Sequence, residues 1–389
     1  MAYNKGITME IITFAFGEPR NPQTWSNVPY FAVKALEEMG HTVHCVDIRP
    51  QSVIFNKLVM MVNKALRLVL GKDTLFLVEL WPVWRRYYDS VVAKAVNKYP
   101  MADLLLLFTY SLSGERITEI PSVLFSDFTV DYAIHELYKR EPKWYEKNLI
   151  LAQDQIMQNA DCIVSLFPKA AEHYQQRYQT DNIYKISGHI LNCDEPVGDV
   201  DALAQQKFCA NEILFIRRKA YRQGALCLID AVERYNTAHP DFPLHLNIIG
   251  MTDELLGIQS NETVTCHGIL NKADSVQRQT YYDLIRKAKC IANTTKNWGG
   301  ISSITEAMLF GTPVITSKYD EFSEIFGEDL SFGYYCESEN VDKLAQALAD
   351  LLAKDKDAYA QLARNAHNSV KDFTWQNCIV SILDRCKNC

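Results

Sequence analysis

Residues 290–326 constrain the fold of this chain more than any other stretch; they read CIANTTKNWGGISSITEAMLFGTPVITSKYDEFSEIF. The stretch opens with the apolar run CIAN and continues through a polar segment that ends in Gly299 and Gly300. From Ile301 onward its apolar residues are spaced as in a helix. Gly311 follows this pattern, where a residue of positive φ commonly ends a helix, and the next apolar run is VIT. The stretch therefore predicts a strand, a glycine loop, a helix and a second strand.

The start of the predicted helix is a candidate anion site formed by Gly299, Gly300, Ile301 and Ser302. The first turn of a helix leaves backbone N–H groups unpaired, and the helix dipole adds partial positive charge there. Glycines let a ligand approach the backbone closely. A diphosphate is an anion of the size and charge that such a loop binds.

Glu306 has two interpretations at this stage. With Ser303 it has the S-x-x-E spacing of a capping box, in which the glutamate only satisfies an amide at the helix start. Alternatively, a carboxylate one turn into a helix and next to a bound diphosphate can accept the hydroxyls of a ribose. Spacing alone favours neither interpretation.

Residues 300–317, GISSITEAMLFGTPVITS, resemble the carboxyl-proximal pattern of the retaining GT-B glycosyltransferases of the group 1 family, E-x7-E followed by A-M-x-x-G-x-P-V-I. Glu306 matches the second glutamate, which binds the nucleotide ribose in that family. The first glutamate, which orients the donor sugar, falls on Trp298. Either a neighbour such as Asn297 or Lys296 substitutes for it, or the donor is held differently.

The resemblance implies an α/β chain of GT-B fold, with two Rossmann-like domains whose parallel sheets face each other across a cleft. It implies a hexosyltransferase that moves a sugar from a nucleotide-sugar, most often UDP- or GDP-linked, to a glycan or lipid-linked acceptor with retention of configuration. No cofactor and no metal are expected. A sugar-nucleotide epimerase or a phosphorylase on the same fold, and a catalytically dead nucleotide-sugar-binding relative, are the alternatives.

The basic loop that follows the strand EILFI reads RRKAYRQG. Positive side chains after a strand and before a helix can neutralise a pyrophosphate leaving group. The family pattern there is G-R, four residues, then K-G, so Arg218 matches the arginine and Gly224 the final glycine. Gln223 replaces the lysine, and Arg222 is the candidate for the missing charge. The alternative is a solvated basic loop.

The amino-terminal part opens with the buried-strand run MEIITFAF, a loop that contains Gly17 and Arg20, a helical pattern and a second strand at residues 41–48. This order is Rossmann-like, but the G-x-G-x-x-G fingerprint of dinucleotide-binding proteins is missing. In the family this first loop faces donor and acceptor, so Gly17 and Arg20 are candidate site residues. A plain turn between strand and helix is the alternative.

Asp127 follows the predicted strand SVLFS. Ligands of open α/β sheets gather outside the carboxyl ends of the strands, which places this carboxylate toward a substrate. In the family a histidine or aspartate at this point lies close to the transferring sugar, and Asp127 matches that aspartate. A helix N-cap is the alternative.

Residues 206–372 are predicted to form a second Rossmann-like domain that binds the nucleotide-sugar, after a first, acceptor-side domain at 1–195. The acidic segment between them is interpreted as a linker. In the family, the loop after the strand VTCHG lines the nucleobase, which implicates Gly268 and Ile269. Residues 373–389 follow the family's F-[ST]-W pattern and imply a last helix that crosses back to the first domain.

A net charge of −7 gives the chain no overall attraction to nucleic acid, so a nucleic-acid partner is not expected. No apolar run is long enough for a spanning helix and no signal peptide is recognised, so a cytoplasmic protein is expected. The eleven scattered cysteines suit a reducing compartment. The D-x-D pairs at 199–201 and 355–357 have a spacing that metal-dependent transferases use, but they are interpreted as solvated charges.

Residues 52–71, SVIFNKLVMMVNKALRLVLG, place a narrow basic stripe of Lys57, Lys64 and Arg67 on an otherwise apolar helix. So wide an apolar face is more often packed in a core or between domains. The alternative is an interfacial helix that lies on the inner face of an anionic membrane. The aromatic and basic segment WPVWRRYY follows closely and suits a membrane edge or an acceptor groove.

Overall fold

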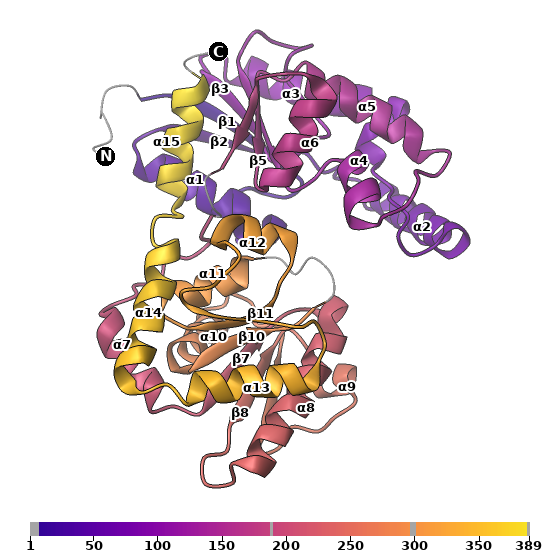
Figure 1. The fold of residues 1–389 in the computed structure, drawn as a ribbon. Helices are drawn as coiled ribbons and strands as arrows, with labels where there is room; N and C mark the ends of the chain where they lie inside the picture. Colours follow the sequence, from indigo (N-terminus) through magenta and orange to yellow (C-terminus); the bar gives the residue numbers. More distant parts are fainter. Residues whose placement is uncertain (1–7, 187–189, 296–300, 387–389) are drawn as a thin grey trace. The chain divides into compact units, whose positions relative to one another are not determined.

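The computed structural model describes residues 8–186, 190–295 and 301–386. The chain divides into two units, residues 1–186 with 375–389 and residues 187–374. In each unit a parallel sheet is flanked by helices (Figure 1). The prediction of two Rossmann-like α/β domains is confirmed.

The first unit is built on a six-stranded sheet of order β2-β1-β3-β4-β5-β6, in which every pairing is parallel. Its strands are β1 Glu10–Ala15, β2 Thr42–Asp47, β3 Leu104–Leu107, β4 Ser122–Ser126, β5 Cys162–Ser165 and β6 Ile183–Lys185. The inner strands are buried along their length, which explains why they read as unbroken apolar runs.

Helices connect these strands and cover the sheet. They are α1 Val28–Glu38, α2 Val53–Leu70, α3 Pro82–Lys98, α4 Val130–Tyr132, α5 Glu146–Gln158, α6 Pro168–Tyr178 and α15 Trp375–Cys386. The last of them, α15, packs on α1, and its Trp375 ring lies 5.6 Å from the Phe125 ring of β4. Helix α15 is thus part of the first unit's core.

The second unit also has a six-stranded parallel sheet, of order β12-β11-β10-β7-β8-β9. Its strands are β7 Glu212–Ile216, β8 His245–Ile249, β9 Val264–Gly268, β10 Cys290–Asn293, β11 Val314–Ser317 and β12 Gly333–Cys336. The chain builds outward from β7 through β8 to β9 and then returns to place β10 on the other side of β7. The strand order therefore reverses between β7 and β10, and ligands of such sheets bind at this switch point.

Eight helices of the described residues belong to the second unit. They are α7 Val200–Phe208, α8 Arg222–Ala238, α9 Asp253–Leu256, α10 Ser275–Lys287, α11 Ser302–Leu309, α12 Asp320–Phe326, α13 Val341–Leu352 and α14 Lys356–Val370. Helix α8 packs against α13, and α7 packs against α14 and α10. Apolar residues of α8, α13 and the central strands share one core.

Two expectations from the sequence are wrong: the linker before the second domain and the core packing of residues 52–71. Residues 200–206 of the predicted linker belong to helix α7. Asp199 caps this helix by accepting from the backbone N–H groups of Asp201 and Ala202. Asp355 likewise caps α14. The first aspartate of each D-x-D pair is therefore a helix cap.

The interpretation of residues 52–71 as a helix packed in the core is also wrong. The interdomain alternative stays a prediction. Helix α2 forms as the periodicity predicts, but none of its residues is buried. Of the helices in the described residues, none combines the length and the apolar character that a membrane span requires.

Candidate functional site

Arg217 lies at the switch point of the second sheet, directly after β7. Its side chain is buried, and its Nε donates to Asn293 Oδ1 of β10 at 3.1 Å. Its Nη1 donates to the Ile216 carbonyl at 3.2 Å and to Ser303 Oγ in the first turn of α11. Burial lowers the pKa of Arg217, because the charged guanidinium loses hydration. An anion at this point would offset the lost hydration of the buried charge.

Asn293 supplies a second indication of a ligand at the switch point. The residue is 2% exposed, and within the described residues its amide nitrogen Nδ2 has no hydrogen-bond partner. Buried amide donors are nearly always paired in folded proteins. A phosphate oxygen next to Arg217 and the start of α11 would pair it.

Glu306 is buried in α11, and its carboxylate accepts three hydrogen bonds. Lys272 Nζ donates to both oxygens, at 2.6 and 2.7 Å, and the Tyr281 hydroxyl donates to Oε2 at 2.6 Å. Burial and the neighbouring carboxylate raise the pKa of Tyr281 well above its usual value, so the phenol keeps its proton. The capping-box interpretation of Glu306 is wrong, because α11 has no side-chain cap and Ser303 bonds with Arg217 and the Ile216 carbonyl.

The ribose interpretation of Glu306 remains a prediction, and it depends on how many hydrogen bonds the carboxylate can still accept. A carboxylate offers about four lone-pair positions, and three are occupied here. One ribose hydroxyl can donate to the remaining lone-pair position. Two ribose hydroxyls can donate only if Lys272 moves away from one of the carboxylate oxygens of Glu306.

The structure describes only part of the predicted anion site at Gly299, Gly300, Ile301 and Ser302. Gly299 and Gly300, and Trp298 before them, lie outside the described residues. Ile301 is buried and precedes α11, and Ser302 is the first residue of the helix. The amides of this first turn lie on the same element as Ser303, which the Arg217 guanidinium contacts.

Arg218 and Arg222 differ from Arg217 in their surroundings. Arg218 is exposed. Arg222 donates from Nε to the Leu255 carbonyl at 2.8 Å and from Nη2 to the Leu256 carbonyl at 2.7 Å. The Arg222 guanidinium thus pairs with carbonyl groups at the carboxyl end of α9, where the helix dipole favours a cation. Within the described residues, Arg217 is the one of the three arginines that contacts β10 and α11.

Gly224 lets the start of α8 approach β10. A Cβ at this position would lie 1.9 Å from the Thr294 carbonyl oxygen. Because that oxygen is backbone, it cannot move aside as a flexible side chain would.

We therefore expect Gly224→Ala to destabilise the protein by about 3 kcal/mol, measured by urea unfolding. Gln223→Ala, at the exposed neighbouring position, is the control and should change stability by less than about 0.5 kcal/mol. Equal stability of the two variants would show that α8 can shift away from β10.

Gly268 and Ile269 lie at the carboxyl end of β9. Gly268 has a positive φ of 64°, its N–H donates to the Met251 carbonyl, and its carbonyl accepts from Gly250. Ile269 is 67% exposed. The contact of this loop with a nucleobase, which the family resemblance implies, stays a prediction.

In the first unit, Gly17 and Arg20 belong to the loop after β1. Gly17 has φ 131° and donates to Asp47 Oδ1 at 3.0 Å, and a Cβ there would meet Thr24 at 2.7 Å. Arg20 Nη2 donates to Glu37 at 2.6 Å and to the Val43 carbonyl at 2.9 Å. The Arg20 side chain thus ties the loop to α1 and β2, a structural role that the sequence does not indicate.

Asp127 follows β4 at the carboxyl edge of the first sheet. The N-cap interpretation is wrong, because Thr129 caps α4. The Trp25 side chain hydrogen-bonds Asp127, yet burial dominates and raises the pKa of this carboxyl to about 6. Trp25 is the first of three consecutive residues with positive φ, at 35°, 54° and 70°. Backbone strain of this kind is concentrated at functional sites.

The raised pKa of Asp127 predicts a pH dependence of stability. Its folded pKa of about 6 exceeds the ordinary 3.8, so the folded state holds the proton more tightly than the unfolded chain. The stability that this proton contributes is complete below 3.8 and is lost as the pH rises through about 6. We expect the difference in unfolding free energy between wild type and Asp127→Asn to change across this window, measured by urea unfolding. A constant difference would contradict the raised pKa.

Residues 210–354 match the family model described as "Glycosyl transferases group 1". The matched segment covers most of the second unit. The match includes Arg217, Lys272, Asn293 and Glu306, so the cluster at the switch point lies within the segment that matches the family model. A search of curated protein sequences returns no match.

Solved structures show the same fold at low identity. A Rickettsia africae glycosyltransferase aligns with a TM-score of 0.64 and 16% identity over 99% of both chains. Anabaena HepE, solved with UDP and glucose, aligns with a TM-score of 0.59 and 16% identity over 97% of this chain and 99% of its own. S. aureus TarM, solved with UDP, aligns with a TM-score of 0.53 and 15% identity over 77% of this chain. The alignment covers 59% of the TarM chain. The fold is GT-B.

Sequence reasoning missed several residues of the cluster at the switch point. Arg217 is the neighbour of Arg218, which the family pattern indicates. The pattern has four residues between its arginine and the position of Gln223, and a spacing of five residues would match Arg217 instead. Lys272 and Tyr281 carry no motif and meet Glu306 only through folding. In the first unit, Trp25 gives no sequence signal for its bond to Asp127.

Within the described residues, no group of three or more His, Cys, Asp or Glu side chains is arranged to hold a metal ion.

Proposed function

We propose that this protein transfers a sugar from a nucleotide-sugar donor, UDP-linked in the first instance, to a glycan or lipid-linked acceptor. The observation that carries the proposal is the cluster at the switch point of the second sheet, where a buried arginine, an unpaired amide and a helix start converge within a glycosyltransferase domain. UDP is bound in the structures of HepE and TarM, which share the fold.

The donor diphosphate would lie against Arg217, Asn293 Nδ2 and the first amides of α11. These groups are positive or hydrogen-bond donors, and they are already in place. Preorganised donors of this kind stabilise charge as it develops on a leaving group. Glu306, one turn further along α11, would accept a ribose hydroxyl.

We propose that the transfer retains configuration and uses no metal ion. The bond between the sugar C1 and the diphosphate oxygen breaks, and the acceptor oxygen bonds C1 on the same face. The acceptor hydroxyl proton passes to the departing phosphate oxygen. Arg217 and the start of α11 would carry the charge that a metal carries elsewhere. Asp127 is the candidate contact for the transferring sugar, as the family resemblance implies.

A panel of UDP-, GDP-, ADP- and CMP-sugars in a thermal-shift assay tests the donor class. A ligand present at a hundred times its dissociation constant stabilises a protein by about 2.7 kcal/mol. The donor that raises Tm is then incubated with acceptors, and the released nucleoside diphosphate and the anomeric configuration of the product are measured. A donor that binds without release of nucleotide favours the catalytically dead relative. Epimerised donor or phosphate-dependent cleavage favours the other two alternatives.

A further inference from the structure

Helix α2 of the first unit, labelled in Figure 1, has an apolar sequence and no buried residue. Ile54, Leu68 and Val69 are 82%, 78% and 80% exposed. Soluble proteins rarely leave so many large apolar side chains of one helix in water unless that surface has a partner.

The side chains of α2 divide around the helix into three sectors. Phe55, Val59, Leu66 and Leu70 are half-buried and mark the side that faces the protein, where the Phe55 ring lies 4.0 Å from the Trp84 ring. At about 100° per residue, a second sector about 120° wide carries only apolar residues, all of them exposed. They are Ile54, Leu58, Met61, Val62, Ala65, Leu68 and Val69.

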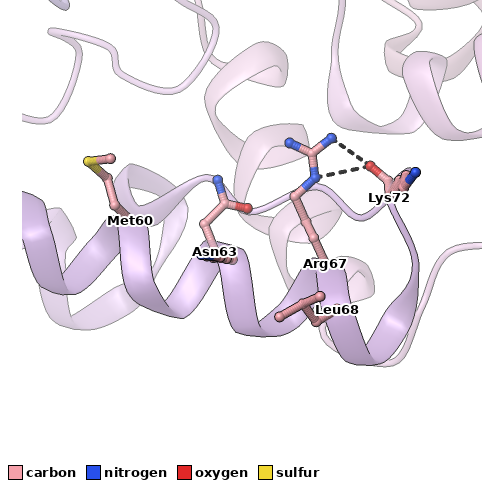
Figure 2. Close-up of a pocket in the computed structure, with 6 residues that line it drawn as sticks. Met60, Asn63, Arg67, Leu68 and Lys72 are labelled. Atoms are coloured by element: carbon pink, nitrogen blue, oxygen red, sulfur yellow. Dashed lines mark hydrogen bonds between the residues drawn. The ribbon is translucent and has the colours of Figure 1, made fainter.

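The third sector of α2 is basic. It carries Lys57, Lys64 and Arg67, with Val53 and Met60 between them, and the helix contains no aspartate or glutamate. Arg67 and Lys64 line a hollow of about 320 Å³ together with Lys72 from the following turn. Met60, Asn63 and Leu68 complete its lining (Figure 2).

The hollow has the chemistry of a phosphate site. Arg67 donates from Nε and Nη2 to the Lys72 carbonyl, at 3.1 and 2.7 Å, which fixes the guanidinium at its rim (Figure 2). None of the described residues that line it carries a carboxylate. The adjacent Asp73 pairs with Arg140 and Lys143, so its negative charge is already balanced.

We propose that α2 is an interfacial helix that attaches this protein reversibly to an anionic lipid bilayer. Its apolar sector enters the boundary between headgroups and acyl chains, and Lys64, Arg67 and Lys72 bind headgroup phosphates. An apolar face flanked by lysine and arginine is the pattern of helices that lie in this boundary. The net charge of −7 opposes attachment only weakly, because charges beyond about 8 Å are screened at physiological salt.

A bilayer fits α2 better than a second copy of the chain does. Pairing two α2 helices along their apolar sectors would bring the two basic sectors close together without counter-charge. Anionic headgroups supply that counter-charge. The inference does not depend on the proposed sugar transfer.

Co-sedimentation of the full-length protein with vesicles tests the proposal. Vesicles of phosphatidylcholine with phosphatidylglycerol should bind the protein at least about tenfold more tightly than phosphatidylcholine alone. Leu58→Glu and the double variant Lys64→Glu/Arg67→Glu should each weaken binding by about tenfold or more, with unchanged Tm because these positions are exposed. Val276→Glu/Lys287→Glu, at exposed positions of α10, is the matched control and should bind like wild type.

Three results would overturn the proposal. The first is a wild-type protein that ignores both kinds of vesicle at low salt. The second is binding that the α2 variants leave intact. The third is concentration-dependent self-association, followed by light scattering, that Leu58→Glu abolishes while vesicle binding persists, because a second copy would then cover α2.

Discussion

Arg217→Lys should lower kcat for release of nucleoside diphosphate by about 10²- to 10³-fold, the loss seen when one preorganised donor is removed from a transition state. Lysine keeps the positive charge, but it lacks the planar fork that reaches Asn293, Ser303 and the Ile216 carbonyl together. Turnover of the best donor, measured with saturating acceptor, is the readout.

Arg218→Ala is the matched comparison for Arg217→Lys, because the two arginines are adjacent and Arg218 is exposed. If Arg217 contacts the diphosphate, Arg218→Ala keeps kcat within a few fold of wild type and both variants stay folded. A larger loss in Arg218→Ala than in Arg217→Lys would restore the assignment that the four-residue spacing indicates. Thermal unfolding of each variant separates lost chemistry from lost folding, since a buried polar group left unpaired costs about 1–3 kcal/mol.

Glu306→Gln should have a large effect on both stability and nucleotide binding. It leaves Lys272 without its carboxylate partner, and breaking a fully buried pair costs about 3–5 kcal/mol. The Lys272 side chain is 20% exposed, so solvent reduces this cost. Nucleotide affinity should fall by about tenfold or more through loss of a charged acceptor for the ribose.

The double variant Glu306→Gln/Lys272→Met separates the two effects. Removing both charges should recover most of the lost Tm, because no unpaired ammonium remains in the partly buried site. Nucleotide affinity should stay low if Glu306 binds the ribose. Wild-type affinity in the double variant, measured by calorimetry with UDP, would mean that Glu306 serves only as the partner of Lys272 and Tyr281.

The bond between Lys272 and Glu306 has a consequence for binding. A ribose that uses both oxygens of Glu306 must displace a charge-assisted hydrogen bond, which weakens the apparent affinity for nucleotide. Lys272→Met alone should expose the carboxylate, and its effect on affinity shows whether the lysine competes with the ribose or joins in binding the nucleotide.

The candidate site was partly predictable from sequence. The glycine loop and the helix from Ile301 follow from local spacing, and Glu306 follows from the family pattern. The choice between Arg217 and Arg218 does not follow from the sequence. The helical and strand periods indicate which side of an element is buried, but they do not indicate which residue of another element it contacts. Arg217 and Asn293 are 76 residues apart in sequence and meet only because β7 and β10 are neighbours.

The sequence by itself determined the alternation of buried strands with helices, and thereby two parallel sheets, because continuous apolar runs and 3.6-residue periods report burial within each element. It also determined that residues 53–70 form a helix. Only the tertiary structure decided which surfaces those elements contact. The apolar face of α2 is exposed because nothing in the described part of its unit packs on it. Glu306 already accepts hydrogen bonds because the loop after β9 brings Lys272 to it. Both depend on strand order and chain path, which residue periodicity does not encode.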